Sequence, residues 1–335
     1  MRLALYLRPW RTEMWTLAAQ LGVDVAVTGI PTDGPGAPKR WDFISLLHLR
    51  QAFADEGIEA MVIEDSPPMD RIRLRQPGWE DELAAVAEFI TNMGAAGFRI
   101  WCYNWMAAFN WYRTSVTTRA RGGALVTSYD HRLTERAPLT EAGIVEEERL
   151  WDSYAAFIEQ IVPVAEAAGV TLALHPDDPP LSPIRGVARI FRSPEAFERA
   201  LALSPSPNHA ITFCQGSFAT MGVDIPATIR RMAAIRPIPF VHFRDVRGTP
   251  DNFVETFHDD GPTDMLEAMA TYQAIGFTGP MRPDHVPTLY GDANDTPGYT
   301  TRGRLYAIGY MRGLMEAVKS GRLGSKPARE ALARA

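Results

Sequence analysis

Residues 143–180 read GIVEEERLWDSYAAFIEQIVPVAEAAGVTLALHPDDPP, and this stretch contains the repeating unit that decides the fold. Apolar side chains recur at helical spacing over 143–168, and a short apolar run follows at Thr171–His175. A polar segment rich in aspartate and proline closes the stretch at 176–180. A helix, a buried strand and a polar loop in this order are typical of a parallel α/β protein.

The same unit recurs along the whole chain, because short apolar runs alternate with segments of helical periodicity. Strands are expected at Leu3–Leu7, Val23–Thr28, Ala60–Glu64, Arg99–Tyr103, Thr171–His175, Ala210–Cys214, Pro239–His242 and Pro280–Asp284. Helices are expected near 11–21, 41–56, 79–96, 143–168, 193–203, 222–235, 262–275 and 301–318. Eight alternations favour an α/β fold of the (β/α)8 TIM-barrel type, a single catalytic domain over 1–319 followed by an exposed tail at 320–335.

An open, doubly wound sheet is the alternative fold for such an alternation. That fold usually carries a glycine-rich phosphate loop after its first strand, whereas this chain has Arg8-Pro9-Trp10-Arg11 there. The longest irregular stretches follow the carboxyl ends of predicted strands, where a barrel carries its active-site loops. They are residues 29–40, 104–140, 176–192 and 285–300.

Composition excludes several classes of function. The 335 residues contain 34 Lys and Arg against 40 Asp and Glu, a formal net charge of −6, so no broad basic surface for nucleic acid is expected. No apolar run approaches the roughly 20 residues that a membrane-spanning helix needs. Two cysteines cannot form a disulfide framework, which fits a reducing cytoplasm. We therefore expect a cytoplasmic protein with no nucleic-acid or membrane partner.

Four consecutive predicted strands end in side chains that can bind a metal. His175 ends the fifth strand and Cys214 the sixth, while His242 and Asp284 end the seventh and eighth. All four would face the same barrel mouth, so we expect a divalent-metal site there. The thiolate suits Zn²⁺, whereas imidazole and carboxylate with open positions suit Mn²⁺ or Fe²⁺, so the residue types leave the metal open. Cys102 also ends a strand, but we expect it to be a small buried core residue.

Other polar residues near the mouth suggest substrate binding. Arg113, Arg244 and Arg282 are candidates for a bidentate hold on a substrate carboxylate. His258 either lines the pocket or orders its loop. The two aspartates of HPDDPP are expected to differ, Asp177 orienting a metal ligand and Asp178 capping the turn before a proline.

With these residues in place, the chain resembles the mannonate dehydratase family, metal-dependent TIM-barrel lyases that act on hexuronate-derived sugar acids. The motifs that carry the resemblance are CYNWMAAFNWYRT at 102–114, HPDDPP at 175–180, CQGS at 214–217, FVHFRD at 240–245, ETFHDDG at 255–261, RPDH at 282–285 and PGY at 297–299.

The resemblance implies a function and a set of site residues. It implies the same metal ligands, His175, Cys214, His242 and Asp284, and it assigns the acid/base pair to His285 and Tyr299. The implied metal is Mn²⁺, with Fe²⁺, Co²⁺ or Zn²⁺ as alternatives. The implied reaction removes water from D-mannonate to give 2-keto-3-deoxy-D-gluconate. Which of the two acid/base residues is the acid stays open.

Several segments depart from the family pattern. The second strand leads into VAVTGIPTDG at 25–34 without the usual histidine, and the segment Asn110–Ser115 lacks two carboxylates that the family carries. These changes fall on groups that would face the substrate, so they indicate the same chemistry on a related aldonic acid. The partner expected is a small-molecule sugar acid, and association into a homo-oligomer is compatible with the composition.

Two other functions remain open from the sequence. A xylose-isomerase-like sugar isomerase or epimerase also uses a divalent metal at a barrel mouth, although those sites rely on carboxylates and Cys214 favours the dehydratase. A non-catalytic sugar-acid binding protein would keep the pocket, but it would not need His285 and Tyr299.

Overall fold

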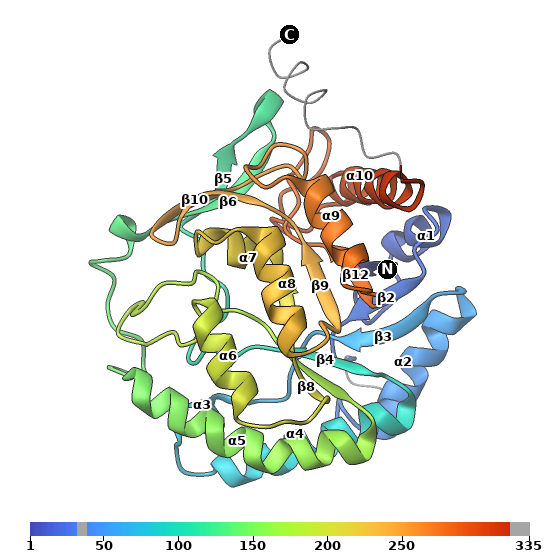
Figure 1. Cartoon of the computed structure of the whole chain (residues 1–335). Helices are drawn as coiled ribbons and strands as arrows, with labels where there is room; N and C mark the ends of the chain where they lie inside the picture. Colours follow the sequence, from blue (N-terminus) through green and yellow to red (C-terminus); the bar gives the residue numbers. More distant parts are fainter. Residues whose placement is uncertain (32–38, 322–335) are drawn as a thin grey trace.

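The computed structural model describes residues 1–31 and 39–321, and it contains a closed barrel of eight parallel strands. Around the barrel the strands follow the order β1-β12-β9-β8-β7-β4-β3-β2 (Figure 1). Their bounds are β1 Arg2–Tyr6, β2 Val25–Thr28, β3 Glu59–Ile63, β4 Ile100–Tyr103, β7 Thr171–Leu174, β8 His209–Cys214, β9 Phe240–Phe243 and β12 Pro280–Pro283. The predicted TIM barrel is confirmed, and each predicted strand overlaps one of these eight.

Helices surround the barrel and connect its strands (Figure 1). The eight that match the predicted helices are α1 Glu13–Gln20, α2 Phe43–Asp55, α4 Trp79–Ala96, α5 Glu147–Ala168, α6 Pro194–Ala202, α8 Ile225–Ile235, α9 Met265–Ala274 and α10 Thr301–Lys319. Their ends follow local sequence rules. Ser193 and Asp224 accept hydrogen bonds from backbone N–H groups at the starts of α6 and α8, and Gly169 ends α5 in a left-handed conformation.

The loops contain more regular structure than the sequence indicated. A four-stranded antiparallel sheet, in the order β10-β11-β6-β5, forms from the expected irregular stretch 104–140 and from residues 246–255, where no strand was expected. Its strands are β5 Ser115–Arg119, β6 Leu125–Asp130, β10 Val246–Thr249 and β11 Asn252–Glu255, and short helices occur at α3 Asp70–Leu74, η1 Arg121–Gly123, η2 His131–Leu133 and α7 Gln215–Thr220. The strands are short and partly exposed, so they lack the long apolar pattern that marks the barrel strands.

The barrel interior is apolar below its mouth. Alternate residues of the strands point inward and form one cluster, namely Ala4, Val25, Val27, Val62, Ile100, Cys102, Ala173 and Phe240. A larger cluster fills the layer between the strands and the surrounding helices. Cys102 is buried in the interior cluster, as expected, and accepts a hydrogen bond from the Thr212 hydroxyl at 3.2 Å.

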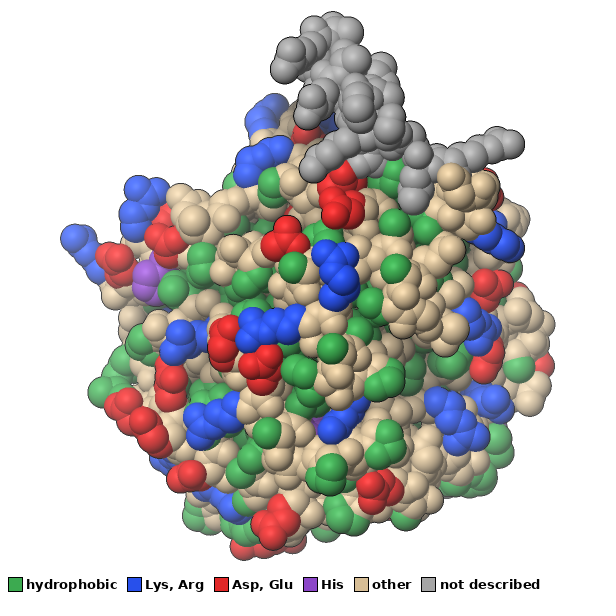
Figure 2. All heavy atoms as spheres, in the orientation of Figure 1, with side chains coloured by type: hydrophobic (Ala, Val, Ile, Leu, Met, Phe, Trp, Pro, Cys, Tyr) green, Lys and Arg blue, Asp and Glu red, His purple; other side chains and the backbone are tan. Residues whose placement is uncertain are grey.

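The surface and the chain ends relate to the expected partners and to the expected tail. Figure 2 shows Lys and Arg side chains interspersed with Asp and Glu on the face drawn. In the described part of the chain, no helix combines the length and apolar character that crossing a membrane requires. The last barrel helix ends at Lys319. The tail expected at 320–335 and the loop expected at 29–40 lie largely outside the described residues.

Candidate active site

A pocket of about 940 Å³ opens at the carboxyl ends of the barrel strands. Residues from most of the strands line it, because parallel strands all end at the same rim. His175, His242 and Asp284 line its floor, and His285 and Tyr299 stand beside them. The pocket therefore lies where the sequence predicted the active site.

The four predicted metal ligands meet at this floor. The ligand atoms of His175, Cys214 and His242 all lie within 4.8 Å of one another, and Nε2 of His175 is 3.2 Å from Nδ1 of His242. Oδ2 of Asp284 is 3.7 Å from the same Nδ1. Strand register produces this convergence, since Cys214 is paired with His242 across β8 and β9.

The donor set fits a divalent transition metal. Two imidazoles, a thiol and a carboxylate are borderline ligands of the kind that Mn²⁺, Fe²⁺ and Zn²⁺ accept. Burial lowers the pKa of His175, which keeps the imidazole neutral and its lone pair available for a metal. Burial alone would raise the pKa of Asp284, but His285 and Arg282 outweigh it and hold that pKa well below its usual range. We call His175, Cys214, His242 and Asp284 the ligand quartet.

Glu64 supports the quartet, although the sequence analysis did not select it. Its Oε2 lies 3.4 Å from Nε2 of His242, on the side of the ring opposite Nδ1. A carboxylate in this position orients a ligating histidine and raises its basicity. Burial opposes the ionised form of Glu64, yet Arg282 and His242 lower its pKa to about 2.

Two other groups of three potential metal donors occur among the described residues. Glu64, Cys102 and His242 form one, and it shares His242 with the quartet. Burial raises the pKa of the Cys102 thiol well above its ordinary value, which disfavours the thiolate a metal needs. The other group joins Asp178, Glu255 and His285, and two arginines already neutralise its carboxylates.

His285 and Tyr299 lie side by side over the quartet, as an acid/base pair requires. Their rings are 5.6 Å apart, and the Tyr299 hydroxyl donates a hydrogen bond of 2.9 Å to Oδ1 of Asp284. The His285 Nδ1 lies 2.8 Å from Oε1 of Glu255. Because an ionised carboxylate only accepts, Nδ1 carries a proton in this pair, and Nε2 is the ring nitrogen that this contact leaves available.

Electrostatics favours an ionised Glu255 and a protonated Tyr299. Burial would raise the pKa of Glu255, but Arg244 and His285 lower it below its ordinary value, so the carboxylate is ionised. Burial, followed by the charge of Asp284, raises the pKa of Tyr299 well above its ordinary value. Trp111 lies against the other face of the His285 ring, with the two centroids 4.9 Å apart. Glu255 and Trp111 therefore hold the imidazole in one orientation.

The four residues expected to contact the substrate do not line the pocket. Arg113 binds Asp178 through two N–H groups, at 2.6 and 2.9 Å, and binds Glu255 at 2.7 Å. Arg282 pairs with Glu64 and Asp284, at 2.7 and 2.9 Å. The side chains of both arginines are only 1% exposed. This placement corrects the expectation, because ion pairs within the chain already occupy the guanidinium groups.

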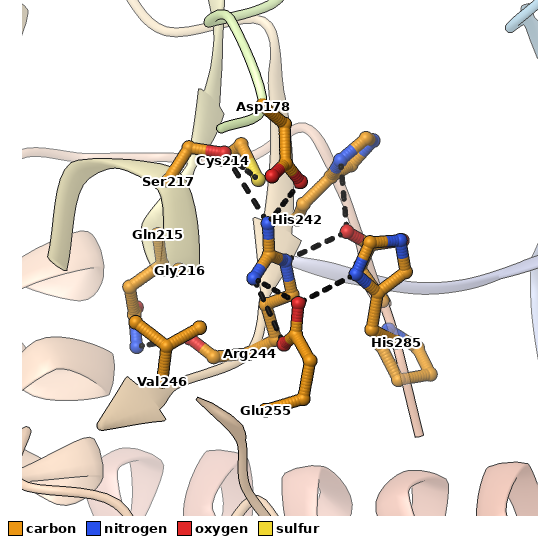
Figure 3. A network of polar contacts seen from close by, with 12 residues as sticks. Asp178, Cys214, Gln215, Gly216, Ser217, His242, Arg244, Val246, Glu255 and His285 are labelled. Atoms are coloured by element: carbon orange, nitrogen blue, oxygen red, sulfur yellow. Dashed lines mark hydrogen bonds and ion pairs between the residues drawn. The ribbon is translucent and has the colours of Figure 1, made fainter. Parts of the chain in front are cut away.

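Arg244 and His258 lie equally deep. Figure 3 shows the Arg244 guanidinium between the carboxylates of Asp178 and Glu255, with His285 on the far side of Glu255. Arg244 also donates to Oδ2 of Asp284 at 2.9 Å. A Cβ atom at Gly216 would overlap this guanidinium, which explains the glycine in the CQGS motif. His258 is within hydrogen-bond distance of the Phe243 carbonyl oxygen through Nε2, at 2.8 Å, so of the two roles left open it orders its loop.

The two aspartates of HPDDPP have roles opposite to those expected. Asp178 accepts from Arg113 and Arg244 and belongs to the buried ionic network. Asp177 instead accepts from the backbone N–H of Phe191 at 2.7 Å and fixes the loop after β7. The error arose because local turn chemistry gives no information about arginines that come from distant strands.

Comparison with known proteins identifies a family over most of the chain. The family model D-mannonate dehydratase (UxuA) matches residues 12–142 and 136–323. Mannonate dehydratase 2 of Halalkalibacterium halodurans is 32% identical over 324 residues, covering 89% of this chain and 90% of that protein.

Solved structures extend the likeness to three dimensions. The crystal structure of mannonate dehydratase from Streptococcus suis serotype 2 superposes with a TM-score of 0.87 at 29% identity, covering 97% of both chains. A xylose isomerase domain protein from Planctomyces limnophilus shares the fold, with a TM-score of 0.64 at 12% identity over 95% of this chain and 98% of that one. By its sequence, its fold and the family model that it matches, the chain belongs to the D-mannonate dehydratase (UxuA) family.

Proposed function

We propose that this protein is a divalent-metal-dependent sugar-acid dehydratase that converts D-mannonate, or a closely related aldonic acid, into the 2-keto-3-deoxy acid and water. For D-mannonate the product is 2-keto-3-deoxy-D-gluconate. The observation that carries the proposal is the convergence of the ligand quartet, three of whose members line the pocket, next to His285 and Tyr299.

The reaction requires a proton to leave C2 and a hydroxyl group to leave C3. The C2 proton is weakly acidic, because its loss places negative charge beside the carboxylate. A divalent cation held by the ligand quartet, Mn²⁺ by preference and Fe²⁺, Co²⁺ or Zn²⁺ otherwise, would act as a Lewis acid that stabilises this charge. The departing hydroxyl group needs a proton to leave as water.

The geometry supports a division of labour between His285 and Tyr299. With its Nδ1–H held by Glu255, His285 has Nε2 as the ring nitrogen that can accept the C2 proton once the imidazole is neutral. Tyr299 keeps its hydroxyl proton and can donate it to the C3 oxygen as water forms. The enol that remains takes up a proton at C3 to give the keto acid.

The experiment is a turnover assay on a panel of aldonic acids, D-mannonate included, with Mn²⁺ added and with 2-keto-3-deoxy acid formation as the readout. Dehydration that stops on addition of a chelator and returns with metal supports the proposal. Tyr299→Phe should lower kcat by about 100-fold or more while leaving metal content unchanged, since it removes only the hydroxyl proton donor.

Other results would overturn the proposal. Isomerisation or epimerisation of sugars without loss of water would assign the protein to the xylose-isomerase-like alternative. Metal and sugar acid bound without turnover of any substrate would indicate a binding protein. Unchanged turnover in Tyr299→Phe would remove that residue from its assigned role.

A further inference from the structure

The arginines that line the pocket fall into two classes. Arg40 lies 3.6 Å from Asp65, and Arg73 pairs with Asp70 at 3.0 Å. Arg8 and Arg304 also line the pocket, but neither forms an ion pair with any carboxylate in the described part of the chain. Because every other pocket arginine has a counterion, these two cations need an explanation.

Arg304 is held in place by neutral groups. Its Nη1 donates to the Tyr6 carbonyl oxygen at 3.1 Å, and its Nε donates to the Thr300 carbonyl oxygen at 3.4 Å. No hydrogen bond involves its Nη2 among the described residues, and the side chain is half-buried in the pocket wall. The guanidinium is therefore fixed in direction while part of its donor capacity remains unused.

Arg8 adds a second positive charge to the same wall. It lies two residues beyond Tyr6 in the chain, and its guanidinium is 5.3 Å from the centre of the Trp10 ring. Burial, with smaller contributions from Arg8 and Arg282, lowers the pKa of Arg304 to about 10. Tyr299 and, to a smaller extent, Asp292 oppose this effect.

Contacts of Tyr299 and Tyr6 connect the ligand quartet with the wall that carries the two arginines. The Tyr299 hydroxyl bonds to Asp284 of the quartet, whereas its ring lies 6.1 Å from the ring of Tyr6. The carbonyl oxygen of Tyr6 in turn accepts from Arg304. Arg8 and Arg304 line the same pocket as His175, His242 and Asp284, so a sugar acid with its carboxylate at the quartet can present its other end to them.

We propose that Arg8 and Arg304 bind a second anionic group, a carboxylate or a phosphate ester, at the end of the sugar-acid chain remote from the ligand quartet. A neutral hydroxymethyl end would leave the half-buried guanidinium of Arg304 without a counterion, with the positive charge of Arg8 on the same wall. An anionic end forms charge-assisted hydrogen bonds with both, and a guanidinium fork matches either group in geometry. The proposal rests on the proposed function, because it assumes a sugar acid with its first carboxylate at the quartet.

The test measures affinity and turnover with three ligands that differ at one end. Isothermal titration calorimetry on the Mn²⁺-loaded protein compares D-mannonate with D-mannarate, which has a carboxylate at C6, and with D-mannonate 6-phosphate. We expect one of the two doubly anionic ligands to bind at least about tenfold more tightly than D-mannonate, since each charge-assisted hydrogen bond can contribute that much. Which ligand shows the gain tells a carboxylate from a phosphate.

Matched variants locate the effect. Arg304→Gln and Arg8→Gln should each remove most of the gain, whereas Arg40→Gln should retain it because Asp65 already pairs with Arg40. Arg8 is exposed, so its variant tests the proposal even if Arg304→Gln fails to fold. Equal affinity for all three ligands, or a gain that survives in both variants, would overturn the proposal.

Turnover separates this proposal from the one on which it rests. Arginine-dependent binding of a doubly anionic acid without dehydration would contradict the proposed function and leave the second anion site standing. Dehydration of D-mannonate with no preference for a second charge would support the proposed function and contradict the second anion site.

Discussion

The lower interior of the barrel and its mouth are built from the same strands, yet they hold opposite kinds of side chain. Phe240 and Ala173 belong to the apolar interior cluster, and the residues two positions further along, His242 and His175, belong to the ligand quartet. Successive inward-facing residues of a strand are two positions apart, so the two regions are adjacent layers of the barrel interior. The change from hydrocarbon to ligands therefore occurs within about 7 Å of strand length.

Different kinds of interaction stabilise the two regions. Removal of apolar surface from water stabilises the lower interior, and the cost of a change there scales with the volume lost. Ion pairs hold the mouth, where Arg113, Arg244 and Arg282 bridge carboxylates that would otherwise repel one another. Removing one charge from such a buried network leaves others without a partner. The following predictions test this contrast in order of decreasing effect.

Arg244→Met should produce the largest loss of stability. The substitution leaves Asp178, Glu255 and Asp284 each without one of its cations, and we expect the free energy of unfolding to fall by about 3–5 kcal/mol. Urea unfolding followed by circular dichroism measures it. The matched control is Arg231→Met, whose exposed pairs with Glu195 and Glu198 should contribute no more than about 1 kcal/mol. Equal losses in the two variants would contradict the network's role.

Acid should destabilise the fold through His209, a buried titratable group at the start of β8. Burial, followed by the charge of Arg236, lowers the pKa of His209 to about 4, so the folded protein holds the neutral imidazole while the unfolded chain titrates near 6.5. The stability from this group is complete above pH 6.5 and is lost as the pH falls toward 4. Unfolding free energies at pH 7 and pH 4 should differ by about 3 kcal/mol more in the wild type than in His209→Gln. An identical pH dependence in the two proteins would refute the assignment.

Glu255→Gln should reduce catalysis in addition to the stability that it loses as a member of the buried ionic network. The amide keeps the size of the side chain but no longer holds His285 Nδ1–H with a full charge, so we expect kcat to fall by about 10–100-fold with KM unchanged. Steady-state kinetics on the preferred acid gives both numbers. A matched decrease in kcat on Arg231→Met, which lies away from the pocket, would indicate a general defect instead.

Ile100→Val should have the smallest effect. It removes one methylene group from the apolar interior cluster, and we expect a loss of about 0.5–1.5 kcal/mol in unfolding free energy with no change in kcat. A large loss of activity would show that the interior layer and the mouth are coupled more closely than their separate chemistry indicates.

The barrel and the ligand quartet could be predicted from the sequence, whereas the pocket wall that carries Arg8 and Arg304 could not. Strand runs such as Ala210–Cys214 and Phe240–Phe243 are apolar throughout, and their terminal residues mark the mouth because all strands are parallel. Arg8 and Arg304 gave no comparable signal. Arg8 follows the first strand and Arg304 lies near the start of α10, and only their position in the pocket without a counterion distinguishes them from Arg40 and Arg73.

The antiparallel sheet shows the same limit. Its four strands are short, and β5 is largely exposed, so no periodicity separated them from loops. Yet this sheet ends with Glu255, whose carboxylate binds His285, Arg113 and Arg244. A residue that the sequence placed in a loop is thus central to the site.

The sequence by itself determined the fold class and the kinds of ligand at the mouth, because both depend on spacing along one strand or helix. The tertiary structure alone decided which charges pair. Arg113 and Glu255 are 142 positions apart, and Glu64 and Arg282 are 218 apart. Closure of the barrel brings such residues within hydrogen-bond distance, and no local pattern encodes that distance. For the same reason, no local pattern showed that Arg113, Arg244 and Arg282 form ion pairs within the protein. Nor did it show that Arg8 and Arg304 line the pocket.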